Sequence, residues 1–310
     1  MGGTMAESDV PFPIYKVLLD EGRLGERIAE ADAALHDCHL CGNDCGIDRT
    51  ERAGPCRIQD EVYVASFGPH FGEENPLRGA RGSGTIFFAG CNLHCVYCQN
   101  YDISQRVTGS VTPPQALASI MLNLQERGCH NINLVSPTHV ASHIVPGLAL
   151  AIQAGLEIPI VYNTGGYDAP QVLALMDGLV DIYMPDMKYA DPDVGRRFST
   201  VPDYPAVNQA AVREMHRQVG DLILDEHGVA RRGLLVRHLV LPDGLAGTAE
   251  IAQFLADEIS PDTYINVMRQ YRPAYEAWAC ESLDRRITAA EYQAAVDAVK
   301  DAGLHRFDRR

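Results

Sequence analysis

Three cysteines, Cys91, Cys95 and Cys98, lie close together in the stretch GTIFFAGCNLHCVYCQN, residues 84–100. Cysteine thiolates are ligands for zinc and for iron–sulfur clusters. A structural zinc ion takes four protein ligands, and His94 is a poor fourth because it adjoins Cys95 in a cramped chelate. A [4Fe–4S] cluster has four iron corners, which are normally held by four thiolates. Three thiolates would leave one iron open for an exchangeable ligand, as a catalytic cluster requires.

A second group of cysteines precedes this loop, with the spacing C-x2-C-x3-C-x10-C. It consists of Cys38, Cys41, Cys45 and Cys56. Four thiolates can close a structural zinc site or a second iron–sulfur cluster, and the spacing does not decide between them. A cluster would relay electrons or bind a substrate, whereas zinc would only staple its surroundings. The two remaining cysteines, Cys129 and Cys280, are expected to be small buried apolar side chains.

Composition narrows the range of partners and compartments. The chain has 310 residues, a formal net charge of −15 and no run that approaches the length of a membrane span. An acidic chain lacks the basic surface that tracks phosphates, so we expect no nucleic-acid partner. The N-terminus has no basic stretch followed by an apolar one, which argues against a signal peptide. We therefore expect a cytoplasmic protein without a membrane partner, whose reduced, clustered thiols bind metal rather than form disulfides.

Six short runs rich in apolar and β-branched residues predict buried strands of a parallel sheet. They span residues 85–90, 131–136, 158–163, 181–186, 234–241 and 263–268. Helical patterns alternate with them, at 113–127, 141–155, 170–178, 206–219 and 247–258. This alternation predicts an α/β fold, either a barrel or a doubly wound sheet. No G-x-G-x-x-G follows the first strand, which counts against a dinucleotide-binding fold.

The unusual polar residues collect just after the predicted strands, at the rim where barrel enzymes carry their active sites. Asp186 and Lys188 are two residues apart at a strand end, so both side chains can face the barrel mouth. An ordinary surface ion pair would explain them too. Arg237 and His238 are adjacent within the fifth strand, so only one of them can face the lumen. We expect Arg237 to do so, because a buried arginine needs an anionic partner.

The spacing C-x3-C-x2-C, with Tyr97 before the third cysteine, resembles the radical S-adenosylmethionine (SAM) superfamily. The extension CVYCQN is similar to the branch of that superfamily that contains pyruvate formate-lyase activating enzyme. This likeness runs from CHLCGNDCGIDR to NVMRQYRP, over most of the chain. It implies an incomplete (β/α)6 TIM-like barrel of the radical SAM type. We expect three segments: a helical, Cys-rich N-terminal metal module at 1–80, the partial barrel at 81–275 and a C-terminal covering helix at 276–310.

The resemblance also implies cofactors and their ligands. Cys91, Cys95 and Cys98 would hold a [4Fe–4S] cluster whose open iron is chelated by SAM, and one electron would cleave SAM to a 5′-deoxyadenosyl radical. The residues implied to bind SAM are Tyr97, Ser136, Thr138, Asn163, Asp186, Lys188 and Arg237. Of these, Asp186 and Lys188 match an Asp-x-Lys motif of the activating enzymes. The segment SPTHV departs from the superfamily's Gly-Gly-Glu pattern, and His139 in it is either a hydrogen-bonding partner or a satisfied rim histidine.

The expected activity is hydrogen abstraction by the radical, from a glycine of a partner protein as in the activases of glycyl-radical enzymes. An electron donor such as flavodoxin or ferredoxin is implied as a second partner. The alternatives are a radical SAM enzyme that acts on a small molecule or peptide, and a non-catalytic iron–sulfur or zinc protein.

Overall fold

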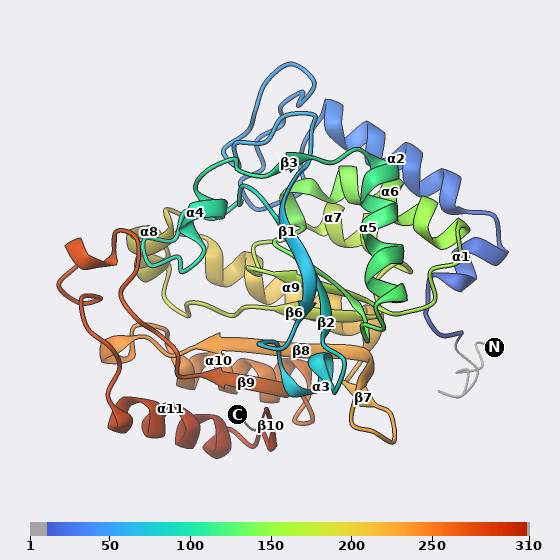
Figure 1. The fold of residues 1–310 in the computed structure, drawn as a ribbon. Helices are drawn as coiled ribbons and strands as arrows, with labels where there is room; N and C mark the ends of the chain where they lie inside the picture. The colour runs from blue at the N-terminus through green and yellow to red at the C-terminus, as the bar shows by residue number, and fades with distance from the viewer. Residues whose placement is uncertain (1–10, 309–310) are drawn as a thin grey trace.

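The fold of residues 11–308, described by a computed structural model, is an open α/β sheet with helices packed along its outer face (Figure 1). Residues 1–10 and 309–310, the two ends of the predicted N- and C-terminal segments, lie outside the described residues. The start of the N-terminus, and with it part of the signal-peptide prediction, therefore falls outside them too. Within the described residues the strand order is β10-β9-β8-β6-β5-β4-β2-β1-β3, and β7 pairs with β8.

The strands are β1 Tyr63–His70, β2 Ser83–Phe88, β3 Ser110–Val111, β4 Ile132–Val135, β5 Ile160–Thr164, β6 Ile182–Pro185, β7 Ile223–Leu224, β8 Ala230–Leu239, β9 Tyr264–Met268 and β10 Arg306–Phe307. The α-helices are α1 Lys16–Asp20, α2 Leu24–His36, α3 Asn75–Arg78, α4 Tyr101–Ser104, α5 Pro114–Glu126, α6 Ala141–Gln153, α7 Pro170–Met176, α8 Pro192–Ser199, α9 Tyr204–Val219, α10 Thr248–Phe254 and α11 Ala289–Asp301.

The six predicted strands are present as β2, β4, β5, β6, β8 and β9, and they run parallel to one another. The sheet does not close, because β3 and β10 lie at its two ends. An α/β fold with an open, mainly parallel sheet is thus confirmed. The five predicted helices are also present, as α5, α6, α7, α9 and α10. Helix α8 was not predicted, because its polar sequence buries little beyond Phe198.

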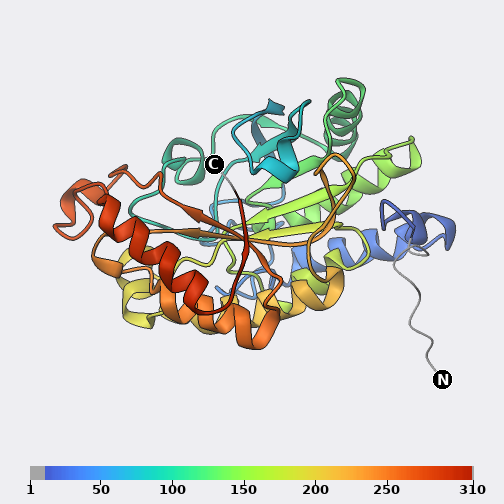
Figure 2. The same cartoon turned by 90° about the horizontal axis from the view of Figure 1, so that it is seen from below.

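Alternation along the strands divides the fold into an outer core and an inner face. On β4, Ile132 and Leu134 join the large core under the helices, whereas Val135 points to the inner face and lines a cavity there. Figure 2 shows the helices α9, α10 and α11 along one side of the sheet. The polar residues that follow the strands are therefore left at the inner rim, where no helix covers them.

The N-terminal residues pack against the rest of the fold. Strand β1 pairs antiparallel with β2, and α2 packs against α6 as part of the main core. The sequence YVASFGPH has no apolar strand pattern because it contains Gly68 and Pro69 and buries only Val64 fully. A proline is tolerated there because β1 lies near the sheet edge, with only the two-residue β3 beyond it.

Within the segment expected to carry a C-terminal covering helix lies α11, which packs against α10. It begins in a capping box: the Glu291 backbone N–H donates to the Thr288 hydroxyl over 3.1 Å, and the Thr288 N–H donates to the Glu291 carboxylate over 2.7 Å. Beyond it, β10 adds a parallel strand beside β9 that is too short for sequence patterns to reveal. None of the helices in residues 11–308 has the length and apolarity needed to span a membrane.

Candidate active site

A cavity of about 270 Å³ lies at the carboxyl ends of the parallel strands. Its walls include nearly all the predicted cluster and SAM ligands of the barrel. They are Cys91, Cys95, Tyr97, Cys98, Ser136, Asn163, Asp186, Lys188 and Arg237. These residues come from five strand ends that are far apart in the sequence. The fold therefore brings together three thiols, one carboxylate and two cations around one space.

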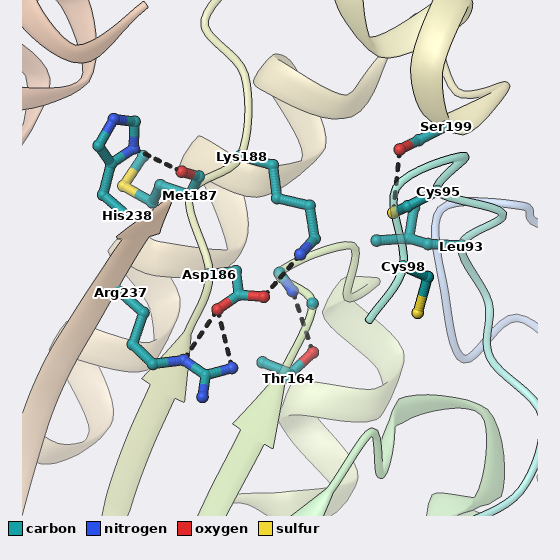
Figure 3. A network of polar contacts seen from close by, with 12 residues as sticks. Leu93, Cys95, Cys98, Thr164, Asp186, Met187, Lys188, Ser199, Arg237 and His238 are labelled. Atoms are coloured by element: carbon teal, nitrogen blue, oxygen red, sulfur yellow. Dashed lines mark hydrogen bonds and ion pairs between the residues drawn. The ribbon is translucent and has the colours of Figure 1, made fainter. Parts of the chain in front are cut away.

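The cysteine loop starts after β2 and turns at once. Gly90, with φ of +77°, makes the first turn, and the Cys98 N–H donates to the Cys95 carbonyl over 3.1 Å. The Ser199 hydroxyl donates to Cys95 Sγ over 3.0 Å (Figure 3). The Ser104 hydroxyl hydrogen-bonds with Cys98 Sγ over 3.1 Å. Hydrogen bonds to sulfur stabilise thiolates and tune the potential of a cluster that they hold.

The donor set fits an iron–sulfur cluster better than zinc. His94, the only nearby nitrogen donor considered for zinc, is engaged on both sides, by the Gln105 side chain at 3.0 Å and the Pro55 carbonyl at 3.1 Å. Burial, together with the neighbouring Cys95, raises the pKa of the Cys91 thiol to about 12, so a thiolate there requires a bound cation. Within residues 11–308 no three His, Cys, Asp or Glu side chains meet closely enough to hold a metal ion. Thiolates that hold a [4Fe–4S] cluster lie farther apart than the ligands of a single metal ion, because each thiolate binds a different iron.

Opposite the cysteines, Asp186 joins two cations in one network (Figure 3). Arg237 Nε and Nη2 each lie 2.8 Å from Asp186 Oδ1, and Lys188 Nζ lies 2.6 Å from Oδ2. The three side chains are only 15–20% exposed. Burial opposes charge on Asp186, but the attraction of Arg237 and Lys188 outweighs it and keeps the pKa of this carboxyl below its usual range. Asp186 therefore remains a carboxylate that fixes both cations at the cavity wall.

The backbone explains why Arg237 rather than His238 faces the cavity. Asp186 and Arg237 pair as a parallel bridge, and the Met187 N–H donates to the Arg237 carbonyl over 2.8 Å. His238 points to the other side of β8, where its Nδ1 hydrogen-bonds to the Met187 carbonyl and its Nε2 to the Thr248 hydroxyl, each over 2.8 Å. Adjacent strand residues face opposite sides, so the pairing of β6 and β8 sets the orientation of Arg237.

After β4, Ser136 lines the cavity but Thr138 does not. Ser136 has φ of +56°, an unusual conformation for a residue other than glycine, and its N–H donates to the Asn163 carbonyl over 2.8 Å. Thr138 is buried, and its hydroxyl is taken up by Asp168 at 2.7 Å and Thr164 at 3.0 Å. The chain coils into a 3-10 helix at Thr138, which turns this side chain away from the cavity.

His139 is buried, and of its two ring nitrogens only Nε2 has a hydrogen-bond partner. Its Nε2–H donates to the Ala89 carbonyl over 2.9 Å, and burial lowers its pKa to about 3, so the ring is neutral at physiological pH. Of the two alternatives for this residue, the geometry favours the structural one, in which it supports the backbone just before the cysteine loop.

Two buried carboxylates near the cavity escaped the sequence patterns. Asp168 accepts hydrogen bonds from the Thr138, Thr164 and Tyr162 hydroxyls at 2.7, 2.7 and 3.1 Å. Glu74 accepts from Asn266 Nδ2 over 2.7 Å, while its Oε2 has no partner. Burial raises the pKa of Glu74, whereas the charge of Arg237 lowers it. Asp168 follows β5 in the segment YNTGGYD. Nothing in the local sequence connects Glu74 to Arg237 near the end of β8, more than 160 residues away.

Gly166 allows the β5 and β6 ends to approach each other. It has φ of +77°, and a Cβ there would collide with the Asp186 carbonyl oxygen and the Asn208 amide. We expect Gly166→Ala to lower the free energy of unfolding by roughly 2–4 kcal/mol, since left-handed strain and overpacking add. Gly155→Ala is the matched control, because Gly155 also has a positive φ but open space around it. Urea unfolding that shows equal losses in the two variants would contradict the predicted collision.

Comparison with known proteins agrees with this geometry. The sequence profile of the radical SAM superfamily matches residues 85–224. Over 288 residues the chain is 32% identical to the uncharacterized protein MJ0674 of Methanocaldococcus jannaschii, covering 90% of this chain and 78% of the relative. The chain belongs to the radical SAM superfamily. The matched range includes the loop with Cys91, Cys95 and Cys98, called the radical SAM cysteine loop below, and the superfamily's cofactors are a [4Fe–4S] cluster and SAM.

Solved radical SAM structures resemble the chain only loosely. SuiB of Streptococcus suis, bound to SAM, has a TM-score of 0.48 at 12% identity and aligns over 68% of this chain and 44% of its own. HydG of Carboxydothermus hydrogenoformans has a TM-score of 0.47 at 16% identity, over 69% and 49%. A domain of pyruvate-formate lyase-activating enzyme from Bacteroides vulgatus has a TM-score of 0.37 at 13% identity, over 63% and 89%. The chain thus spans less than half the length of SuiB and of HydG.

The four cysteines of the N-terminal segment lie outside the cavity. Cys38, Cys41 and Cys56 are buried, Cys45 is partly exposed, and all four are free thiols. Their segment contacts the radical SAM cysteine loop, because Asn43 Nδ2 donates to the Asn92 carbonyl over 2.8 Å.

Proposed function

We propose that the chain is an enzyme that cleaves SAM at a [4Fe–4S] cluster held by Cys91, Cys95 and Cys98, in order to abstract a hydrogen atom. The observation that carries this proposal is that these three thiols face the Asp186 network across one cavity. When bound, the cluster and SAM supply one-electron cleavage of a carbon–sulfur bond and an organic radical. A closed structural metal site, the non-catalytic alternative, would have no use for a polar cavity beside its ligands.

The chain's own residues have distinct tasks in this proposal. Lys188 and Arg237 present positive charge that suits the carboxylate of an amino-acid-like ligand, and Asp186 holds both cations in place. Ser136 and Asn163, from the ends of β4 and β5, offer further polar groups in the cavity wall, in place of the carboxylate that SPTHV lacks. Tyr97, which is buried between Tyr189 and Tyr271, fixes the cysteine loop by edge contacts with both rings.

The substrate we propose is a glycine of a partner protein, as in the activases of glycyl-radical enzymes, with flavodoxin or ferredoxin as the electron donor. Support for it comes from the CVYCQN extension and from the Asp-x-Lys pair at the end of β6. A small molecule or a peptide is the alternative substrate. Hydrogen transfer from a deuterated candidate into 5′-deoxyadenosine would distinguish them, because the label ends in the product only when that candidate is the hydrogen donor.

The core of the proposal is tested on the anaerobically reduced full chain. We expect the EPR spectrum of the reduced cluster to change when SAM is added, and 5′-deoxyadenosine and methionine to form in equal amounts. An iron–sulfur signal that SAM leaves unchanged, without 5′-deoxyadenosine, would overturn the proposed activity.

A further inference from the structure

The first three of the N-terminal cysteines, Cys38, Cys41 and Cys45, lie in one closed loop. Cys38 and Ile47 pair as an antiparallel bridge, in which the Cys38 N–H donates to the Ile47 carbonyl over 3.1 Å. Cys41 and Cys45 lie within that loop, and the Cys45 thiol lies 3.6 Å from the Cys38 carbonyl oxygen. The pairing keeps three of the four thiols at one end of a short hairpin-like turn.

Cys56 joins this group across Gly54. A Cβ on Gly54 would lie 3.6 Å from Cys56 Sγ and 3.7 Å from Cys45 Sγ, so the two sulfurs flank the same glycine. Cys41 lies between Cys38 and Cys45 in the closed loop, and Asn43 Nδ2 lies 3.5 Å from its sulfur. All four thiols therefore belong to this loop and the turn that follows it.

Such a group of free thiols suits a thiophilic metal. Buried thiolates repel one another and lose hydration, and a bound cation offsets both costs. The thiols stand too far apart in the described residues to hold a single ion as they are. Binding must therefore draw the loop inward around one ion or place several metal atoms between the sulfurs. Gly46, which has φ of +54° and no contact that a Cβ would crowd, provides a point in the loop where the backbone can adjust.

The same loop touches the radical SAM cysteine loop through side chains. Asn43 Nδ2 donates to the Asn92 carbonyl over 2.8 Å and lies 3.5 Å from Cys41 Sγ, so one amide connects a thiol of the N-terminal group with the residue after Cys91. Farther along, the His94 Nε2–H donates to the Pro55 carbonyl over 3.1 Å.

Backbone contacts link the two loops as well. A Cβ on Gly90 would lie 2.7 Å from the Cys56 carbonyl oxygen, so only glycine fits between Cys56 and Cys91. Arg57 Nη1 donates to the Gln105 carbonyl at the end of the radical SAM loop. In Figure 1 the N-terminal loop is the light blue segment at the top, above the segment that carries α4. The segment that carries the N-terminal thiols thus contacts the radical SAM loop at several points, namely Gly90, Asn92, His94 and Gln105.

We propose that the four N-terminal cysteines bind a second metal centre, zinc or an iron–sulfur cluster, whose binding holds the radical SAM cysteine loop from behind. The metal fixes the N-terminal loop, and Asn43, Pro55 and Cys56 transmit that order to the residues around Cys91. The proposal rests on the proposed function only in taking the first cluster to be bound by the radical SAM cysteines.

Metal content tests the site itself. Cys38→Ser/Cys45→Ser should lose either one zinc or about four irons with about four sulfides per chain, relative to the wild type. The matched variant, in which Cys91, Cys95 and Cys98 are all replaced by alanine, should keep that metal. Unchanged metal content in the double variant, or loss of all thiol-bound metal in the triple variant, would overturn the second centre. Neither reading requires SAM cleavage, so the second centre fails or stands independently of the proposed activity.

Asn43→Ala tests the coupling between the two loops. It should keep the metal of the N-terminal site, while a chelator removes iron from the radical SAM cluster roughly tenfold faster, as is usual when support behind metal ligands is lost. Rates are followed from the iron–chelator absorbance. If the N-terminal site also holds iron, its release is identified as the phase that is missing in Cys38→Ser/Cys45→Ser, and the remaining phase reports the radical SAM cluster. Asn123→Ala, an exposed change on α5, is the control. An Asn43→Ala rate equal to that of the control would overturn the supporting role.

Discussion

Cys95→Ala is expected to abolish 5′-deoxyadenosine formation, down to the level of a reaction without protein. Cys95 is buried in the middle of the radical SAM loop, where Ser199 donates to its sulfur over 3.0 Å. With two thiolates left, the cluster would lose one of its three protein anchors, and its affinity for the chain falls with it. Liquid chromatography of the reduced, SAM-containing reaction measures the product.

Cys280→Ala provides the control for this loss. Cys280 is only partly buried, contrary to the expectation for a lone cysteine. Its thiol makes a long hydrogen bond of 3.9 Å to the Glu276 carbonyl oxygen. Its replacement should leave 5′-deoxyadenosine formation at the wild-type rate. Cluster iron that persists in Cys95→Ala, with wild-type product formation, would show that the three-cysteine assignment is mistaken.

The parts of the site that the sequence predicts are those encoded locally. The spacing of Cys91, Cys95 and Cys98 within one loop determines their proximity whatever the rest of the chain does. Asp186 and Lys188 share a face because strand residues two apart always do. The six parallel strands were recognisable because strands buried on both faces are nearly continuous apolar runs. Each of these features depends on a few neighbouring residues.

The parts that the sequence did not predict depend on distant contacts or on irregular backbone. Strand β1 gains its place from pairing with β2, although only Val64 among its own residues is fully buried. Thr138 leaves the cavity because a 3-10 turn follows β4, and no pattern distinguishes such a turn from a simple loop. Glu74 meets Asn266 and the field of Arg237 only through the tertiary fold. Sequence periodicity carries no information about such pairs.

Asp186→Asn is expected to weaken both the fold and the binding of SAM. The carboxylate is the only side chain within the described residues that ion-pairs with Lys188 or Arg237 at the cavity. Asparagine keeps the shape of the aspartate side chain but not its charge. Lys188 and Arg237 would then lose the carboxylate that they share. Removing one partner from a buried charge network costs several kcal/mol. Because these side chains are 15–20% exposed, we expect a loss of about 2–3 kcal/mol in the free energy of unfolding.

The effect on ligand affinity follows from the same geometry. In the variant Lys188 and Arg237 lose the group that orients them, so they meet a carboxylate ligand less favourably. We expect SAM to bind roughly 30-fold more weakly, which corresponds to about 2 kcal/mol. Equilibrium binding of SAM to the unreduced protein measures this without turnover. Unchanged affinity would mean that the network has no part in binding.

The stability loss should depend on pH in a defined direction. Arg237 and Lys188 hold the folded-state pKa of Asp186 below the value of about 3.9 in an unfolded chain. The contribution of the Asp186 carboxylate to the free energy of unfolding is therefore fully present above a pH of about 4. It is lost as the pH falls through the folded-state pKa. Urea unfolding of the metal-free protein should show the full gap between wild type and Asp186→Asn at pH 7 and a smaller gap near pH 3. Asp193→Asn, which removes an exposed partner of Arg196, should show almost no gap at either pH. A gap for Asp186→Asn that stays constant across this range would contradict the charge network and assign the loss to shape alone.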